Sequence, residues 1–180
     1  NNGAGDLTIN TSNSTTPSTV AGAQRGIYAV NSQGGALTIT ADNVEGTANI
    51  GIRARQVDGS DPLSLTTTGT VSGGTSGISV DNLGTGNTTI TTSNTSGTGS
   101  VIGGTVGLVV RNTGGGSVYV TTDAVTGNSD DGIDVFSDTF GASVTITANG
   151  SVSGNMVGIE AINQGTGSLI VDASNPHGTG

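Results

Sequence analysis

One motif recurs six times along this chain of 180 residues and constrains its fold more than any other feature. The motif is Val-x-Gly, a gap of three or four residues, and then Gly-(Ile/Leu)-x-(Val/Ala). Its second glycine stands at positions 26, 51, 77, 107, 132 and 158, which gives a repeat of about 25–30 residues. A period of this length is typical of stacked structural repeats, each of which contacts mainly its neighbours.

Each repeat also contains a short segment in which aliphatic and hydroxyl residues alternate. Residues 37–40 are Leu-Thr-Ile-Thr, and residues 144–147 are Val-Thr-Ile-Thr. Period-two alternation places the two kinds of side chain on opposite faces of a strand, so we expect the aliphatic residues inside and the hydroxyls outside. Together with the Val-x-Gly and Gly-Ile-x-Val segments, this pattern predicts three short strands in each repeat.

The repeats predict the fold class. No segment shows the 3.6-residue period of a helix, and the many Gly, Thr, Ser and Asn residues disfavour one. We therefore predict an all-β fold, a single-stranded right-handed parallel β-helix (β-solenoid) of about six coils with 25–30 residues per coil. Residues 1–180 should form one continuous β-helix segment, and because the chain begins in mid-pattern without Met, we expect a fragment of a longer protein with flanking coils.

A longer period, of about 81 residues, groups the coils in threes. The same spacing separates Gly26 from Gly107, Gly51 from Gly132 and Gly77 from Gly158. The longer connections follow this period, since Thr-Ser-Asn occurs at 11–13 and again at 92–94, and Ala-Ser-Asn occupies 173–175. We expect the loops before Val20 and Val101 to protrude once per three coils. Loops of this kind on repeat scaffolds often lie on a binding face.

A polar side chain stands five residues after each motif glycine. In a stack of coils these residues would lie one above another at a corner, where amide side chains can hydrogen-bond along the stack. Buried polar groups need such partners whether or not a ligand exists, so we interpret the row as a structural ladder. Its members are Asn31, Gln56, Asn82, Asn112, Ser137 and Asn163.

Composition excludes several classes of function. Four Lys and Arg residues against thirteen Asp and Glu residues give a net charge of −9, which argues against nucleic acid and anionic membrane surfaces as partners. The absence of Cys excludes disulfides and Cys-based metal sites or nucleophiles. No long apolar run or charged-then-apolar leader occurs, so we expect no direct membrane insertion and no signal peptide in this segment.

These features resemble a known family, the passenger domains of Gram-negative autotransporters, and more loosely other secreted β-helical adhesins. The likeness covers the whole chain and rests on the repeated Val-x-Gly and Gly-Ile-x-Val, on strands such as Gly-Ala-Leu-Thr-Ile-Thr at 35–40, on the Thr/Ser/Asn/Gly surface and on the lack of Cys. The resemblance implies export through the outer membrane and an extracellular or cell-surface location. It also implies an amino-terminal signal and a carboxy-terminal translocator barrel, which we expect outside these residues.

Residues 128–134, Asn-Ser-Asp-Asp-Gly-Ile-Asp, form the most acidic segment. It resembles the paired aspartates of β-helical polysaccharide hydrolases, in which one carboxylic acid protonates a leaving group and another activates water. The chain has one His, His177, in a loop, and no basic cluster for acidic sugars. Turn chemistry explains Asp130 and Asp131, with weak Ca²⁺ binding by these two and Asp134 as an alternative. We expect no catalytic residue, cofactor or metal.

Two outward surfaces are candidates for recognition. The Thr-x-Thr rows, with Thr38, Thr40, Thr89, Thr91, Thr145 and Thr147, resemble the surface of ice-binding β-helices, although Tyr119, Ile170 and Asp172 interrupt them. The strand after each motif glycine carries a second row that differs from coil to coil. Its outward members are Tyr28, Arg53, Arg55, Val109, Arg111, Asp134, Phe136, Glu160 and Ile162, and Phe136 beside Ile162 would form a small apolar patch.

We therefore expect a non-enzymatic structural or adhesive segment of a bacterial surface β-helix that presents loops and one variable face. The partners would be a host-cell or matrix receptor, a glycan, or another copy of the chain, in addition to the flanking coils. The alternatives are a polysaccharide-acting lyase or hydrolase and an ice-binding β-helix.

Overall fold

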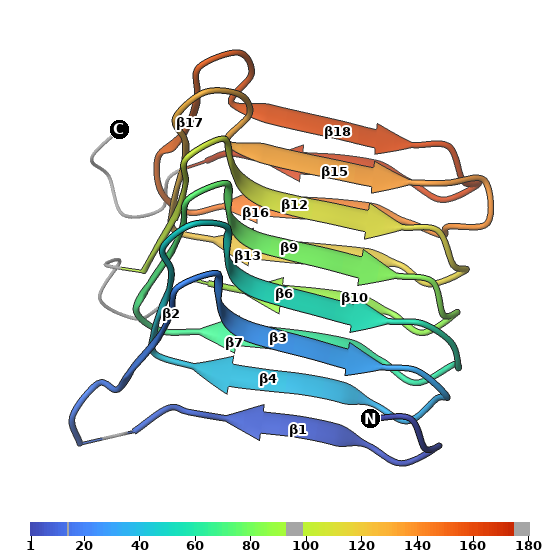
Figure 1. The fold of residues 1–180 in the computed structure, drawn as a ribbon. Coiled ribbons are helices and arrows are strands. Elements are labelled where there is room, and N and C mark those ends of the chain that lie inside the picture. The colour runs from blue at the N-terminus through green and yellow to red at the C-terminus, as the bar shows by residue number, and fades with distance from the viewer. Residues whose placement is uncertain (14, 93–98, 175–180) are drawn as a thin grey trace.

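The alternating segments of the sequence all form parallel strands in the computed structural model, which describes residues 1–13, 15–92 and 99–174. These residues contain nineteen strands and no helix, so no helix within the described ranges could span a membrane. The strands form three parallel sheets, with one strand of every coil in each sheet. Figure 1 shows the coils stacked in chain order from the blue N-terminus to the red C-terminus.

We name the three sheets by their outward residues or by the length of their strands. The threonine sheet contains β1 (Leu7–Asn10), β4 (Leu37–Ala41), β7 (Leu63–Thr67), β10 (Thr88–Thr91), β13 (Val118–Thr122), β16 (Val144–Ala148) and β19 (Leu169–Asp172). The short sheet contains β2 (Thr19–Gly22), β5 (Asn43–Gly46), β8 (Thr70–Gly73), β11 (Ser100–Gly103), β14 (Ala124–Gly127) and β17 (Val152–Gly154). The variable sheet contains β3 (Arg25–Asn31), β6 (Ile50–Gln56), β9 (Ser76–Asn82), β12 (Val106–Asn112), β15 (Ile133–Ser137) and β18 (Ile159–Asn163).

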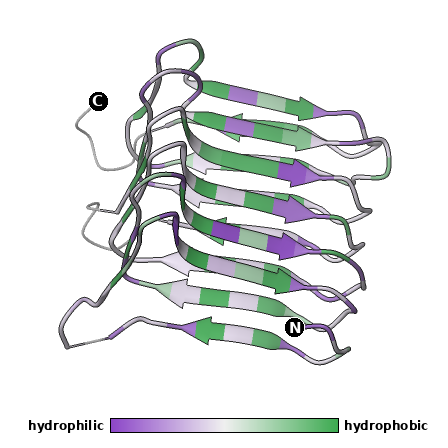
Figure 2. Cartoon of the chain, viewed as in Figure 1, coloured by the Kyte–Doolittle hydropathy of each residue, from purple (hydrophilic) through white to green (hydrophobic). Residues whose placement is uncertain are grey.

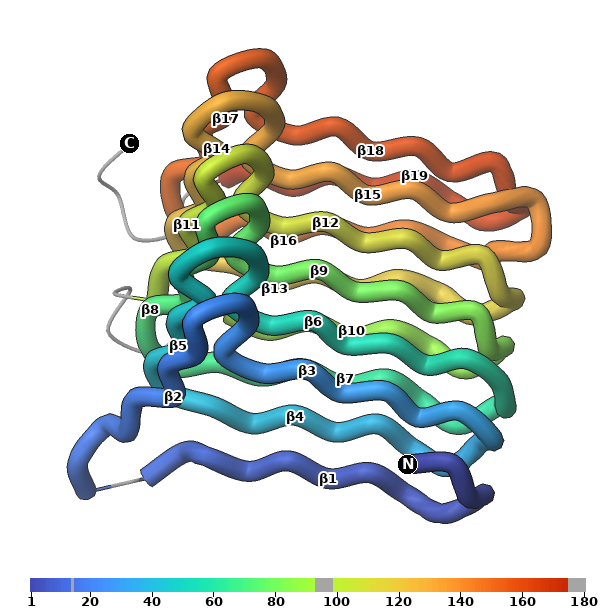
Figure 3. Tube along the Cα trace, viewed as in Figure 1, coloured from blue at the N-terminus to red at the C-terminus, as the bar shows by residue number. Residues whose placement is uncertain are grey.

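Equivalent residues of successive coils pair directly. Ile52 pairs with Ile78, and Ile78 pairs with Leu108, so each position of the motif forms a continuous row along the stack. The sheet order skips two elements at every step, from β3 to β6 to β9, because each coil contributes its three strands to three different sheets. The structure thus confirms a parallel β-helix of about six coils with three strands per coil. Figure 3 shows the course of the Cα trace through the stacked coils.

The core lies between the sheets and consists of the aliphatic side chains predicted to point inward. Alternation is visible along the strands in Figure 2, and in β4 it corresponds to the burial of Leu37, Ile39 and Ala41 between half-buried threonines. Burying an aliphatic side chain contributes about 1.5–3 kcal/mol. Short strands therefore suffice, because every coil adds aliphatic residues from all three sheets to one continuous core.

The motif glycines are required because the coils approach closely at the start of the variable sheet. A Cβ atom on Gly107 would lie 2.5 Å from Cγ1 of Val125 and 2.6 Å from the carbonyl oxygen of Gly132 in the next coil. At the bend before it, a Cβ atom on Gly103 would overlap the carbonyl oxygen of Val106. The two glycines of the motif are thus required for separate reasons. The first allows a tight bend, and the second allows a close contact between coils.

A buried aspartate anchors the first long connection, which extends away from the stack in Figure 1. Asp42 is 5% exposed, and its Oδ2 accepts hydrogen bonds from the backbone N–H groups of Asn13 at 2.8 Å and Ser18 at 2.9 Å. Its Oδ1 accepts a bond from Oγ1 of Thr68 at 2.8 Å. Asp123, the equivalent of Asp42 three coils later, is also buried. Residues 93–98 of the second predicted loop lie outside the described residues.

Candidate functional site

The polar ladder is in register along the whole variable sheet, so each member pairs with the equivalent residue of the next coil. Four of its asparagines donate to turn carbonyls four residues later in the same coil, while Gln56, Asn112 and Asn163 also donate to a neighbouring coil along the stack. Nδ2 of Asn82 donates to the carbonyl of Gly86 at 2.7 Å, and Nδ2 of Asn112 donates to that of Gly116 at 2.7 Å. Asn112 also approaches Oγ of Ser137 at 3.3 Å. The ladder therefore holds the turns that connect the variable and threonine sheets.

The outward side of the variable sheet, which we name the variable face, contains two rows of side chains. The structure places on it every residue predicted for this face and adds Val30, Ser79 and Asp81. Tyr28 is 60% exposed and Ile162 is 41% exposed. The first row is Tyr28, Arg53, Ser79, Val109, Asp134 and Glu160, and the second is Val30, Arg55, Asp81, Arg111, Phe136 and Ile162.

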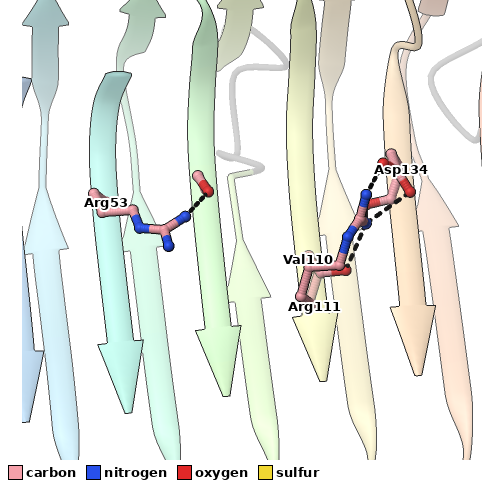
Figure 4. Close-up of polar contacts among 5 residues, drawn as sticks. Arg53, Val110, Arg111 and Asp134 are labelled. Atoms are coloured by element: carbon pink, nitrogen blue, oxygen red, sulfur yellow. Dashed lines mark hydrogen bonds and ion pairs between the residues drawn. The ribbon is translucent and has the colours of Figure 1, made fainter. Parts of the chain in front are cut away.

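Two arginines of the variable face are held by acidic partners in the following coil. Arg53 donates to Oγ of Ser79 and forms an ion pair with Asp81. Figure 4 shows Arg53 and the contact of Arg111 with Asp134. Arg111 donates to both carboxylate oxygens of Asp134, with a distance of 2.8 Å from Nη1 to Oδ1. The hydrogen bond from Arg111 to Asp134 raises the pKa of this guanidinium. These side chains are thus fixed in position and partly neutralised, which the sequence alone did not show.

The remaining prominent side chains of the variable face are apolar or aromatic. The guanidinium of Arg25 lies 4.9 Å from the ring centre of Tyr28, a separation suited to a cation–π interaction. Phe136 and Ile162 pair across neighbouring strands, so the predicted apolar pair is adjacent. The face therefore presents an aromatic group in the first coil, ion pairs in the middle and an apolar pair near the last coils.

Three carboxylates gather where the acidic segment enters the variable sheet. One oxygen each from Asp131, Asp134 and Glu160 lies within 4.8 Å of the other two. Asp130, which the sequence grouped with Asp131 and Asp134, is not a member of this group, because the coil brings in Glu160 of the next strand instead. Only the pairing of Asp134 with Glu160, its equivalent in the next coil, could have revealed this.

The outward side of the threonine sheet, which we name the threonine face, is more uniform. One of its rows has threonine in five successive coils, and the other begins with Thr8 and Thr38 but contains Ser64, Tyr119 and Ile170. The interruption at Tyr119 is therefore confined to one row. The uninterrupted row is Thr40, Thr66, Thr91, Thr121 and Thr147.

Two of the hollows on the described surface each contain one acidic residue. One lies at the bends of the short sheet and contains Glu45 as its acidic residue. The other lies beside the first long connection and contains Asp42, whose oxygens are already occupied. Neither hollow includes a basic residue. His177 lies outside the described residues.

No protein-family model, no curated protein and no solved structure matches this chain.

Proposed function

We propose that this chain is a structural and adhesive segment of a bacterial cell-surface or secreted β-helix, of the autotransporter passenger type, and that its variable face makes the adhesive contact. The observation that carries the proposal is the contrast within the variable sheet. Its inward positions repeat, as Ile52, Ile78 and Leu108 show, whereas the outward positions beside them are Arg53, Ser79 and Val109. A rigid backbone that displays different side chains at a fixed spacing is suited to recognition.

The chemistry of the variable face also supports this role. An interface with a partner is favoured by aromatic residues, arginines and a partly apolar centre, and Tyr28, Arg111 and the Phe136–Ile162 pair supply these groups. The ion pairs hold the arginines in place, which lowers the entropy lost on binding. We propose a host-cell or matrix protein, a glycan or a second copy of the chain as partner, at an extracellular location.

The proposal is tested by binding of the purified chain to cultured host cells, matrix proteins and a glycan array. The informative variant is Phe136→Ser combined with Ile162→Ser, because it removes the apolar pair and leaves the core intact. Thr66→Ser combined with Thr121→Ser on the threonine face is the matched control. We expect the first variant to lose at least tenfold in affinity and the control to bind as the original chain does. Equal loss in both variants, or no binding to any surface, would contradict the proposal.

A second candidate function, ice binding, is favoured by the uninterrupted threonine row. Its hydroxyl and methyl groups repeat at about 4.8 Å between coils, and the second row lies about 6.7 Å away along each strand. We expect Thr91→Lys at the centre of the row to abolish any inhibition of ice recrystallisation, whereas Arg55→Lys on the variable face should have no effect. The absence of ice recrystallisation inhibition and of thermal hysteresis in the unmodified chain would exclude this function.

A further inference from the structure

The acidic group on the variable face joins two coils. Asp131 lies two residues before β15, Asp134 is the second residue of β15, and Glu160 lies in β18 as the direct neighbour of Asp134. Their three carboxylate oxygens are mutually within 4.8 Å. Oxygens bound to one Ca²⁺ ion at about 2.3–2.6 Å are separated by at most about 5 Å, so this set can contact a single ion.

Asp131 is the unusual member of the group, because it is only 7% exposed. Within the described part of the chain no hydrogen-bond donor reaches its carboxylate, although its backbone carbonyl accepts a bond from the N–H of Gly107 at 3.1 Å. Burial of a carboxylate without a donor or a cation is costly. The oxygens of Asp131 are thus available for a positive ligand, and one of them lies in the group formed with Asp134 and Glu160.

The coil does not need an aspartate at this position. The equivalent residues of the earlier coils are Arg25, Ile50, Ser76 and Val106, and none of them is acidic. The bend therefore forms with apolar, hydroxyl or basic side chains at this position, and backbone hydrogen bonds link it to the neighbouring coils. Turn chemistry, which accounts for acidic residues in many bends, does not account for Asp131.

The charge of the group is only partly balanced. Arg111 donates to both oxygens of Asp134, which leaves further lone pairs on these oxygens for a cation. Three carboxylates and one guanidinium leave two negative charges, the charge that one divalent cation neutralises. Carboxylate oxygens in an irregular arrangement suit Ca²⁺, which accepts flexible coordination, better than Mg²⁺, which requires a near-ideal octahedron.

We propose that Asp131, Asp134 and Glu160 bind one Ca²⁺ ion that links β15 to β18, with water supplying the remaining ligands. Three protein carboxylates form an incomplete coordination shell, so we expect a dissociation constant of about 10⁻⁴–10⁻³ M, in the range of extracellular calcium modules. Bound Ca²⁺ would hold the last coils of the described stack together and fix Glu160 beside the Phe136–Ile162 pair.

Isothermal titration of the whole chain with CaCl₂ tests the proposal, with MgCl₂ and NaCl of equal ionic strength as separate arms. We expect one Ca²⁺ site, at least tenfold weaker binding of Mg²⁺ and no saturable effect of NaCl. Asp131→Asn and Glu160→Gln should each weaken Ca²⁺ binding at least tenfold. Asp130→Asn is the matched control, because it removes the adjacent carboxylate that lies outside the group, and it should bind as the original chain does.

Three results would overturn the site. They are no Ca²⁺ binding up to about 10 mM, well above the expected dissociation constant, undiminished binding by Asp131→Asn, and equal loss in Asp130→Asn. Circular dichroism identifies variants that fail to fold. A second measurement on the unmodified chain covers that case, since Ca²⁺ should raise its melting temperature and the chelator EDTA should reverse the rise, whereas an unchanged melting temperature would contradict binding.

Discussion

The threonine face and the variable face are built by the same coils, with the same parallel pairing and against the same core, yet their chemistry differs. On the threonine face one row is threonine from Thr40 to Thr147, whereas on the variable face the row from Tyr28 to Glu160 changes at every coil. Both ion pairs of the described residues belong to the variable face. Stacking thus constrains only the inward positions, and the divergence outside is where specific contacts can reside.

The largest loss of stability is expected from a substitution that disturbs the close contact between coils, because both faces depend on this contact. We expect Gly107→Ala to lower the free energy of unfolding by about 3 kcal/mol, because its Cβ atom would overlap Val125 and the backbone of Gly132. Gly115→Ala is the matched control, since the nearest atoms to its Cβ would lie at 3.6 Å, and it should change stability by less than about 0.5 kcal/mol. Urea unfolding measures both, and equal losses would contradict the packing argument.

The next largest effect concerns the long connection that follows the threonine sheet. Asp42→Asn should cost about 2 kcal/mol at neutral pH, because it removes charge-assisted hydrogen bonds from the backbone of Ser18 and Asn13. These bonds lower the pKa of Asp42 below its ordinary value of 3.8. Its contribution to stability is therefore fully present above that value and is lost as the pH falls through the lower pKa of the folded state.

Urea unfolding of the chain and of Asp42→Asn between neutral pH and about pH 2 measures this contribution. The difference in stability between the two proteins should shrink as the solution becomes acidic below about pH 4. Asp61→Asn, at an exposed position, is the control and should follow the unmodified chain at every pH. A difference that stays constant with pH would show that the charge of Asp42 contributes nothing.

A smaller effect sharpens the role of ion pairs on the variable face. Arg111→Met should lower stability by about 1 kcal/mol, because it leaves the carboxylate of Asp134 without its guanidinium partner. Arg55→Met on the same face has no acidic partner to lose among the described residues and should cost less than about 0.5 kcal/mol. The difference in stability between the two variants should decrease at high salt. Added Ca²⁺ should restore part of the stability that Arg111→Met loses. Identical losses at all salt concentrations would contradict an electrostatic origin.

The smallest effect is expected on the threonine face itself. Thr121→Val keeps the shape and the strand preference of the side chain and removes only its outward hydroxyl, so stability should change by less than about 0.5 kcal/mol. Thr122→Val, one residue later, makes the same change at a buried position. Comparing the stability of the two variants separates the effect of an outward hydroxyl from that of a buried one. A large loss in Thr121→Val measured by thermal unfolding would show that the outward hydroxyls of this row stabilise the coil.

The sequence predicted the fold because periodicity acts on the inward positions, where burial leaves few choices. The spacing of the motif glycines and the alternation in 37–40 were sufficient for the three strands of each coil. The contacts of the outward side chains were harder to predict, because Arg53 contacts both Ser79 directly beside it and, diagonally, Asp81.

The members of the acidic group were also hard to predict from the sequence, because they are brought together by the stacking of coils. Asp130 and Asp131 are neighbours in the sequence, but only Asp131 joins the group, and the stack brings Glu160 to Asp131 and Asp134 instead. Asp42 was missed for another reason, since its partners Asn13 and Ser18 lie in a long connection that has no strand alternation to indicate contacts. Its recurrence as Asp123 three coils later was the available signal.

The variation of the outward rows also bears on how the chain finds its pairing. Coils with the same inward pattern can bury their aliphatic residues after a slip of one whole coil, so the core alone is a poor guide to the correct neighbour. A slip that placed β12 against β6 would set Arg53 beside Val109 and separate it from Ser79 and Asp81. The outward side chains that differ from coil to coil therefore favour the correct strand register, because their contacts form only when each strand pairs with its true neighbour.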